Sequence, residues 1–203
     1  MSLIAFLKRL DKIFFLLINH DSSHSYLDPV MLFVQNPWSW IPLYIFIAWY
    51  LVKKAGRKGW QFIFFSLICV VVTACTGTVL QNLFARPLPS YDLELKSLVR
   101  HLVSNDGVYS FPSLTAATYF GLATCWFWLI LKYTGRRWNW LWIWAGLAGY
   151  AQIYAGREFP SDVAAGAILG ILVGTMMAKA AEFFQAFKYN PRKLFARIPA
   201  EQA

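Results

Sequence analysis

Long apolar blocks, separated by short charged segments, dominate the sequence. The uncharged blocks run over residues 29–52, 59–85, 107–131, 138–156 and 163–178. A bilayer core of ~30 Å takes about 20 helical residues, which is close to the length of most of these blocks. The last block is the shortest, but its helix can continue past Lys179, whose aliphatic stem reaches back to the interface. The pattern therefore predicts a bundle of membrane-spanning helices.

Two of these blocks contain breaks. Pro37 and Pro42 interrupt the first block, and a proline removes one helical hydrogen-bond donor. We therefore expect its membrane helix to begin near Trp38, after a short helix at the interface. The third block starts as a loop and is expected to become helical near Ser113.

The N-terminal segment, residues 1–20, has a different pattern. Its apolar residues recur at helical spacing but are interrupted by Lys8, Arg9, Asp11 and Lys12. Such a segment forms either an amphipathic helix at the interface or a short first span. The two alternatives give five or six transmembrane helices.

Composition agrees with a membrane protein. Hydrophobic residues make up 58% of the chain and charged residues 14%, against roughly 45–50% and ~25% in soluble domains. This chain has too few polar residues to cover the surface of a soluble globular protein. It is also too apolar to be intrinsically disordered. No internal repeat, low-complexity tract or linker divides residues 1–203. We therefore predict one all-α domain, a polytopic membrane helical bundle.

The charges predict the orientation of this bundle. The chain carries a net charge of +9, and short basic loops stay on the cytoplasmic side of a membrane. One set of loops and the tail 188–203 hold Lys53, Lys54, Arg57, Lys58, Lys132, Arg136, Arg137, Lys188, Arg192, Lys193 and Arg197. The loop 84–112 and the turn after residue 156 then face outward. The expected location is a bacterial inner membrane, with these outward loops in the periplasm.

Metal or cofactor chemistry has little support in the sequence. The three cysteines lie inside apolar blocks and form no CxxC motif, so they are expected to act as small apolar side chains. His20 and His24, near Asp21 and Asp28, make only a weak metal-binding pattern. We expect no metal, no cofactor and no nucleic-acid partner.

Three glycines recur in the last block at every fourth position, Gly166, Gly170 and Gly174. Small residues at this spacing let two helix backbones approach closely. The spacing favours packing within the bundle, with a dimer face as the alternative.

Three polar segments lie at the outward ends of the predicted spans. They read QNLFARPLP over 81–89, YSFPSLTAA over 109–117 and AQIYAGREFPSDV over 151–163. Polar groups at this depth are costly to bury and are commonly functional. Because all three lie at the same end of the bundle, we expect them to form one site.

In order and spacing, these segments resemble the type 2 phosphatidic acid phosphatase superfamily of membrane lipid phosphatases. The shapes YxFPSxxAA and IYxGxxFPSDVxAGxxLG carry the resemblance, which covers nearly the whole chain. The signature of that family is KxxxxxxRP, PSGH and SRxxxxxHxxxD. The resemblance implies that the His of the third motif attacks phosphorus and that the following Asp orients it. The His of PSGH protonates the leaving group, while the cationic and N–H groups hold the phosphate oxygens.

The first motif of this chain departs from the signature in either of two alignments. Alignment on Pro89 puts Gln81 at the Lys position and Leu88 at the Arg position. Alignment on the pair Arg86–Pro87 recovers an Arg, but it puts Val79 at the Lys position.

The other two motifs differ from the signature at their reactive positions. Glu158 stands at the position of the nucleophilic His, and Thr115 stands at the position of the acid His. Ser113 and Asp162 are retained. The remaining replacements are Leu114 for Gly, Ala151 for Ser and Gln152 for Arg.

These replacements remove the chemistry that the resemblance implies. Thr115 has no proton to give near neutral pH, and an ionised Glu158 repels a phosphate dianion. Glu158 and Asp162 would also repel each other, which favours one shared proton. Asp162 has a structural alternative, because it or Ser161 can cap the last helix. Arg86 and Arg157 remain as groups that hold a phosphate without cleaving it.

The candidate site therefore corresponds in position to a phosphatase site. Its catalytic positions are Ser113, Thr115, Glu158 and Asp162, and its ligand-binding positions are Gln81, Arg86, Leu88, Gln152 and Arg157. We predict a pseudoenzyme that binds a membrane lipid or lipid phosphate, or that serves with a protein partner as a subunit of a membrane complex. The alternatives are a phosphatase with an altered mechanism, through Glu158, Asp162 or His101, and a lipid transporter.

Overall fold

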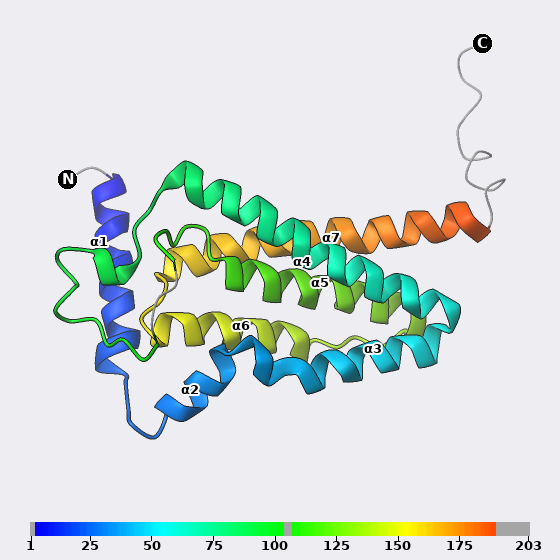
Figure 1. Ribbon diagram of the computed structural model, residues 1–203, viewed down its shortest axis with the longest axis horizontal. Coiled ribbons are helices and arrows are strands. Elements are labelled where there is room, and N and C mark those ends of the chain that lie inside the picture. The colour runs from blue at the N-terminus through cyan, green and yellow to red at the C-terminus, as the bar shows by residue number, and fades with distance from the viewer. Residues whose placement is uncertain (1–2, 104–106, 190–203) are drawn as a thin grey trace, which may run out of the picture.

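The computed structural model describes residues 3–103 and 107–189, and these form a helical bundle (Figure 1). The α-helices are α1 (Leu3–Leu16), α2 (Asp28–Gln35), α3 (Ile41–Ala55), α4 (Arg57–Phe84), α5 (Leu114–Thr134), α6 (Trp140–Tyr154) and α7 (Pro160–Tyr189). Among the described residues the only β-type pairing is an isolated bridge between Pro87 and Tyr109. The predicted all-α membrane bundle is confirmed.

Three of the described helices are long and apolar enough to cross a membrane, over Lys58–Phe84, Leu114–Thr134 and Pro160–Gln185. A fourth candidate is the pair formed by α2 and the helical segment Pro37–Ala55, which is bent by 74°. Helix α6 is shorter, with 15 residues, and runs alongside α5 (Figure 1). Helix α1 instead crosses one end of the bundle (Figure 1), an orientation that suits an amphipathic interfacial helix.

The break between α2 and α3 lies where the prolines predict it. A short 3₁₀ turn, Pro37–Trp40, separates the two helices, and the Asn36 side chain caps it by accepting a hydrogen bond from the Trp38 N–H at 3.1 Å. Helix α3 begins at Ile41, close to the predicted start. Helix α5 begins at Leu114, directly after the predicted position Ser113.

Among the described helices, α5 and α7 share the most extensive contact, and their backbones approach closely. A Cβ atom added at Gly166 would lie 2.4 Å from the Ser113 carbonyl oxygen, and one at Gly170 would lie 2.3 Å from that of Ala117. The third glycine of the series, Gly174, faces α5 in the same way. The series therefore lines the contact of two helix backbones inside the bundle, the first of the two predicted alternatives.

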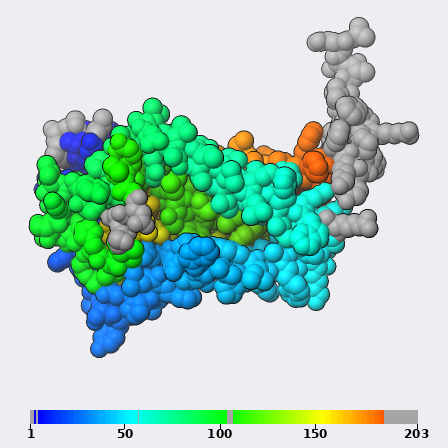
Figure 2. Space-filling view, viewed as in Figure 1, coloured from blue at the N-terminus to red at the C-terminus, as the bar shows by residue number. Residues whose placement is uncertain are grey.

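Large apolar side chains cover the outer surface of the bundle. Helices α3 and α4 cover much of the face seen in Figure 2, and their exposed apolar residues include Ile45, Trp49, Phe64, Leu67, Val71 and Val79. Charged groups gather at the ends instead, as expected for helices that lie in a bilayer. One end carries the basic turns after α3 and α5. The other end carries α1, the loop residues 85–103 and 107–113, and the turn before α7 (Figure 1).

Candidate functional site

The three polar segments meet at one end of the bundle. The Ser113 N–H donates to the Asp162 carbonyl oxygen at 3.0 Å, which joins the second segment to the third. The Gln81 amide donates to the Pro112 carbonyl oxygen at 3.1 Å, and the Ser110 N–H donates to that of Arg86 at 2.9 Å. These bonds bring residues from three distant parts of the chain into one region.

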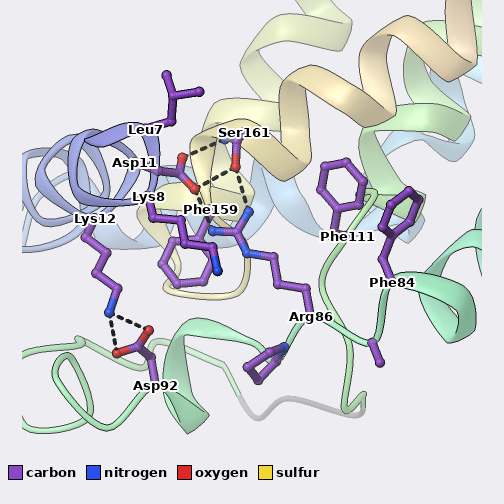
Figure 3. A pocket seen from close by; sticks show the side chains of 12 residues that line it. Leu7, Lys8, Asp11, Lys12, Phe84, Arg86, Asp92, Phe111, Phe159 and Ser161 are labelled. Atoms are coloured by element: carbon purple, nitrogen blue, oxygen red, sulfur yellow. Dashed lines mark hydrogen bonds and ion pairs between the residues drawn. The ribbon is translucent and has the colours of Figure 1, made fainter. Parts of the chain in front are cut away.

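Arg86 is the central charge of this region (Figure 3). Its guanidinium donates to the carboxylate of Asp162 at 2.5 Å, to the Ser161 hydroxyl at 2.6 Å and to the carboxylate of Asp11 at 2.6 Å. It also lies over the Phe159 ring, 4.2 Å from the ring centroid. The guanidinium is therefore shared between two carboxylates of the protein itself.

Asp162 combines this ion pair with a structural role at the start of α7. Its side chain is fully buried, and its second carboxylate oxygen accepts the Phe159 N–H at 3.2 Å. A side chain in the first turn that bonds back to the residue before the helix forms one half of a capping box. Asp162 therefore has a capping role at the start of the helix, which the sequence analysis raised as an alternative, and it also pairs with Arg86.

Glu158 lies in the turn before α7, with only 9% of the residue exposed. Burial raises the pKa of this carboxyl to about 7; the Ser113 hydroxyl lowers it, the charge of Asp162 raises it and Arg157 lowers it. Its Oε2 atom has no hydrogen-bond partner among the described residues. Near neutral pH a large fraction of this group is therefore the neutral acid.

Four other predicted residues are not part of the Arg86 hydrogen-bond cluster, which joins Arg86 to Asp11, Ser161 and Asp162. Gln152 is buried on α6 and donates to the Gln35 carbonyl oxygen at 3.5 Å, while its own Oε1 lacks a partner among the described residues. Leu88 is buried and Thr115 is partly exposed. Arg157 bonds through its backbone to the Gln152 carbonyl oxygen. The structure thus gathers Glu158 with Ser113 and, beside them, Arg86 with Asp162.

Asp11 is a part of this region that the sequence did not indicate as functional. Its carboxylate accepts the Ser161 N–H at 2.8 Å and the Ser161 hydroxyl at 2.5 Å, in addition to Arg86. The one sequence signal for it is an acidic residue among the basic and apolar residues of α1. A pattern of this kind does not reveal a partner that lies 150 residues away.

A cavity of about 690 Å³ adjoins the Arg86 cluster (Figure 3). Its polar wall includes Lys8 and Lys12 of α1, and Lys12 pairs with Asp92 at 2.8 Å. The apolar wall consists of Leu7, Phe84, Ala85, Pro87, Phe111 and Phe159. The cavity therefore offers both cationic and aromatic surface next to the candidate site.

A second polar cluster anchors the end of the N-terminal segment to the bundle. The Asn19 side chain donates to the carbonyl oxygens of Arg100 and Tyr154, both at 2.9 Å. Arg100 and the Tyr154 hydroxyl both contact the carboxylate of Asp28, at 2.6 and 2.8 Å. His20 and His101 are exposed, and the described residues contain no group of three or more His, Cys, Asp or Glu that could hold a metal ion.

The comparison with known families agrees with this arrangement. The profile of the PAP2 superfamily matches residues 62–185, more than half of the chain. The chain belongs to the PAP2 superfamily. This is the family of type 2 phosphatidic acid phosphatases that the three motifs predicted.

Two relatives cover most of the chain. A lipid A 4′-phosphatase of Bacteroides thetaiotaomicron is 28% identical over 171 residues, 80% of this chain and 68% of the relative. The bacitracin transport permease protein BcrC of Bacillus licheniformis is 29% identical over 151 residues, 73% of this chain and 69% of the relative. Together with the apolar helices, these similarities establish an integral membrane protein of a lipid phosphatase-like family.

Two solved structures share the fold. The PAP2-type phosphatidylglycerolphosphate phosphatase of Bacillus subtilis superposes with a TM-score of 0.71 at 19% identity, covering 89% of each chain. Aquifex aeolicus LpxE superposes with a TM-score of 0.60 at 29% identity, covering 84% of this chain and 95% of that one. The first likeness concerns the fold alone, whereas the second extends to the sequence.

Proposed function

We propose that this member of the PAP2 superfamily is a pseudoenzyme that binds a phosphate-bearing membrane lipid without cleaving it. The observation that carries the proposal is the pair Glu158 and Asp162 at the nucleophile and orienting positions, inside an otherwise preserved scaffold. The raised pKa of Glu158 favours the neutral form of this carboxyl, and the neutral form is a poor nucleophile toward phosphorus.

The groups around Glu158 also fit a loss of catalysis. The general acid position holds Thr115, and the position of the third-motif Arg holds Gln152, which faces Gln35. Removing a single oxyanion donor from an enzyme costs ~10²–10³ in rate. Here the nucleophile, the acid and part of the cationic clamp are replaced together, so we expect no turnover by the family route.

The ligand class follows from the charges and from the relatives. Lys8 and Arg86 line the cavity beside the site, and guanidinium and ammonium groups bind phosphate well. The name of one relative, the lipid A 4′-phosphatase of Bacteroides thetaiotaomicron, states a lipid phosphate substrate. A lipid phosphate is therefore the ligand that best fits this chain.

The orientation belongs to the same proposal. The turns at the far end of the bundle hold Lys53, Lys54, Lys132, Arg136 and Arg137. Short basic loops remain in the cytoplasm, so the site end faces the periplasm of a bacterial inner membrane. Its ligand would reach the site from the outer leaflet.

The second candidate function is an active phosphatase in which Glu158 attacks phosphorus. The proximity of Glu158 to Ser113 and Asp162 favours it, because these two positions are retained from the family. Carboxylates do form phosphoenzymes in some ATPases. This route requires the ionised form of Glu158, and therefore turnover that rises with pH and vanishes in Glu158→Gln.

A phosphate-release assay separates the two functions. The purified protein in detergent is incubated with phosphatidic acid and with undecaprenyl pyrophosphate, beside a variant with the family residues restored. The restored variant carries Gln81→Lys, Leu88→Arg, Leu114→Gly, Thr115→His, Ala151→Ser, Gln152→Arg and Glu158→His. We expect no phosphate release by the native protein and measurable phosphate release by the restored variant. Native turnover that is lost in both Glu158→Gln and Asp162→Asn would overturn the pseudoenzyme.

A further inference from the structure

The carboxylate of Asp11 is held in the way that a bound anion is held. It accepts three hydrogen bonds of 2.5 to 2.8 Å, from the Ser161 N–H, the Ser161 hydroxyl and the Arg86 guanidinium. We name these three donors the Arg86–Ser161 cradle. One of them is a backbone N–H in the first turn of α7, where the helix dipole favours negative charge.

The cradle occupies one wall of the cavity described above (Figure 3). Asp11 reaches it from α1, a helix that crosses the bundle end and leaves Leu3, Phe6, Leu7 and Phe14 largely exposed. The side chain of Asp11 itself is only 9% exposed. The carboxylate of a helix at the edge of the bundle thus accepts hydrogen bonds from donors that belong to the bundle itself.

Charge decides whether a ligand can share the cradle with Asp11. Arg86 contributes one positive charge, whereas Asp11 and Asp162 contribute two negative charges. The two carboxylates together outweigh the guanidinium and disfavour a phosphate in the cradle. When Lys8 on the cavity wall is counted in both states, Arg86, Lys8, Asp11 and Asp162 sum to zero with Asp11 in place and to +1 after Asp11 has left.

We infer that the Arg86–Ser161 cradle is a binding site for the phosphate of an anionic lipid, and that Asp11 of α1 is an internal plug that the lipid displaces. The inference rests on the proposed function and assigns its ligand a place next to the altered catalytic positions. The aromatic wall formed by Phe84, Phe111 and Phe159 takes the apolar part of the ligand. The plug makes binding depend on the release of α1.

The test compares the affinities of the full-length wild type and Asp11→Asn for dioctanoyl phosphatidic acid in detergent. The amide keeps the size of the side chain but loses its charge, so it competes less for the cradle. We expect about tenfold tighter binding, within the ordinary range of coupling between two ligands of one site. The matched control is Asp21→Asn, which changes an exposed carboxylate and the net charge equally, and it should bind as the wild type does.

The outcomes separate this inference from the proposed function. Unchanged or weaker binding by Asp11→Asn overturns the plug, and the proposed function stands if the wild type still binds the lipid. If neither the wild type nor Asp11→Asn binds the lipid, both the plug and the proposed function are wrong. Dioctanoylglycerol, which lacks the phosphate, should not respond to Asp11→Asn. Equally tight binding of inorganic phosphate would overturn the assignment to a lipid.

A second measurement uses the wild type and does not depend on the folding of a variant. Displacement of Asp11 removes its hydrogen bonds to Arg86 and Ser161 and loosens α1 on the bundle. The amides of α1 should therefore exchange with solvent faster when dioctanoyl phosphatidic acid is bound. The amides of α5, which is central in the bundle, serve as the internal reference. Unchanged or slower exchange in α1 on binding would overturn the plug.

Discussion

The contact between α5 and α7 and the Arg86 region lie next to each other and are joined by the bond from Ser113 to Asp162. The α5–α7 contact is held by glycines whose Cβ positions meet the backbone of the other helix, and little room for change exists there. The Arg86 region is held by ion pairs and hydrogen bonds among side chains. Both of its carboxylates pair with one guanidinium of the same chain. The catalytic positions beside it differ from the family signature although the scaffold is kept.

The largest effect is expected at Arg86, because both buried carboxylates of the region pair with it. In Arg86→Ala the buried carboxylates of Asp162 and Asp11 lose their shared partner, and unpaired buried charges cost about 3–5 kcal/mol. The thermal stability of the detergent-solubilised protein measures this loss. Arg86→Lys is the control and should lose less, because it keeps the charge. Equal stability of Arg86→Ala and the wild type would show that the ion pairs do not hold the region together.

Gly170→Ala tests the contact between α5 and α7. The new Cβ would lie 2.3 Å from the Ala117 carbonyl oxygen, and such overpacking costs about 3 kcal/mol. The matched control is Gly146→Ala on α6, where nothing lies within 4 Å of the new Cβ. We expect a lower midpoint of thermal unfolding for Gly170→Ala and an unchanged or slightly higher one for the control. Equal midpoints for the two variants would contradict a tight contact.

The raised pKa of Glu158 should make the stability of the protein depend on pH. Its pKa of about 7 in the folded protein lies above the ordinary value of 4.5. Between these values the folded state binds the proton and the unfolded state does not, so stability falls as the pH rises through this window. The loss approaches about 3 kcal/mol above pH 7. Glu158→Gln should remove this dependence and be the more stable protein at about pH 8. Parallel pH profiles of variant and wild type would refute the raised pKa.

The smallest effect is expected at the rim of the cavity. Lys12 pairs there with Asp92 and Glu94, at 2.8 and 2.7 Å. Ion pairs this close to solvent contribute about 0.5 kcal/mol, and salt screens them. Lys12→Ala should therefore shift the unfolding midpoint slightly, and less in high salt. A loss of stability as large as that of Arg86→Ala would contradict this prediction and would show that Lys12 belongs to the tightly held polar region.

The sequence predicted the bundle because its signals are local. Apolar length indicated the helices, Pro37 and Pro42 located the bend between α2 and α3, and the spacing of Gly166 and Gly170 indicated a helix contact. The same signals cannot choose between α5 and a second protein as the partner of that contact. The structure makes this choice through distances between residues far apart in the chain.

The sequence indicated several residues of the candidate site, but not how their side chains pair. Motif positions identified Ser113, Glu158 and Asp162, and the structure brings the last two into electrostatic contact. The sequence left two alignments of the first segment open, and the structure places Arg86, not Leu88, against Asp162. Asp11 escaped notice because its role depends on α1 folding across the bundle end, which no local pattern reports.

Phosphorus NMR of the native protein mixed with dioctanoyl phosphatidic acid tests the central claim most directly. The spectrum reports binding through the lipid signal and hydrolysis through the appearance of inorganic phosphate. We predict a lipid signal that is broadened or shifted by the protein, with no inorganic phosphate formed over hours. Steady formation of inorganic phosphate that is abolished in Glu158→Gln would contradict the pseudoenzyme, and an unperturbed lipid signal would contradict the binding of a lipid phosphate.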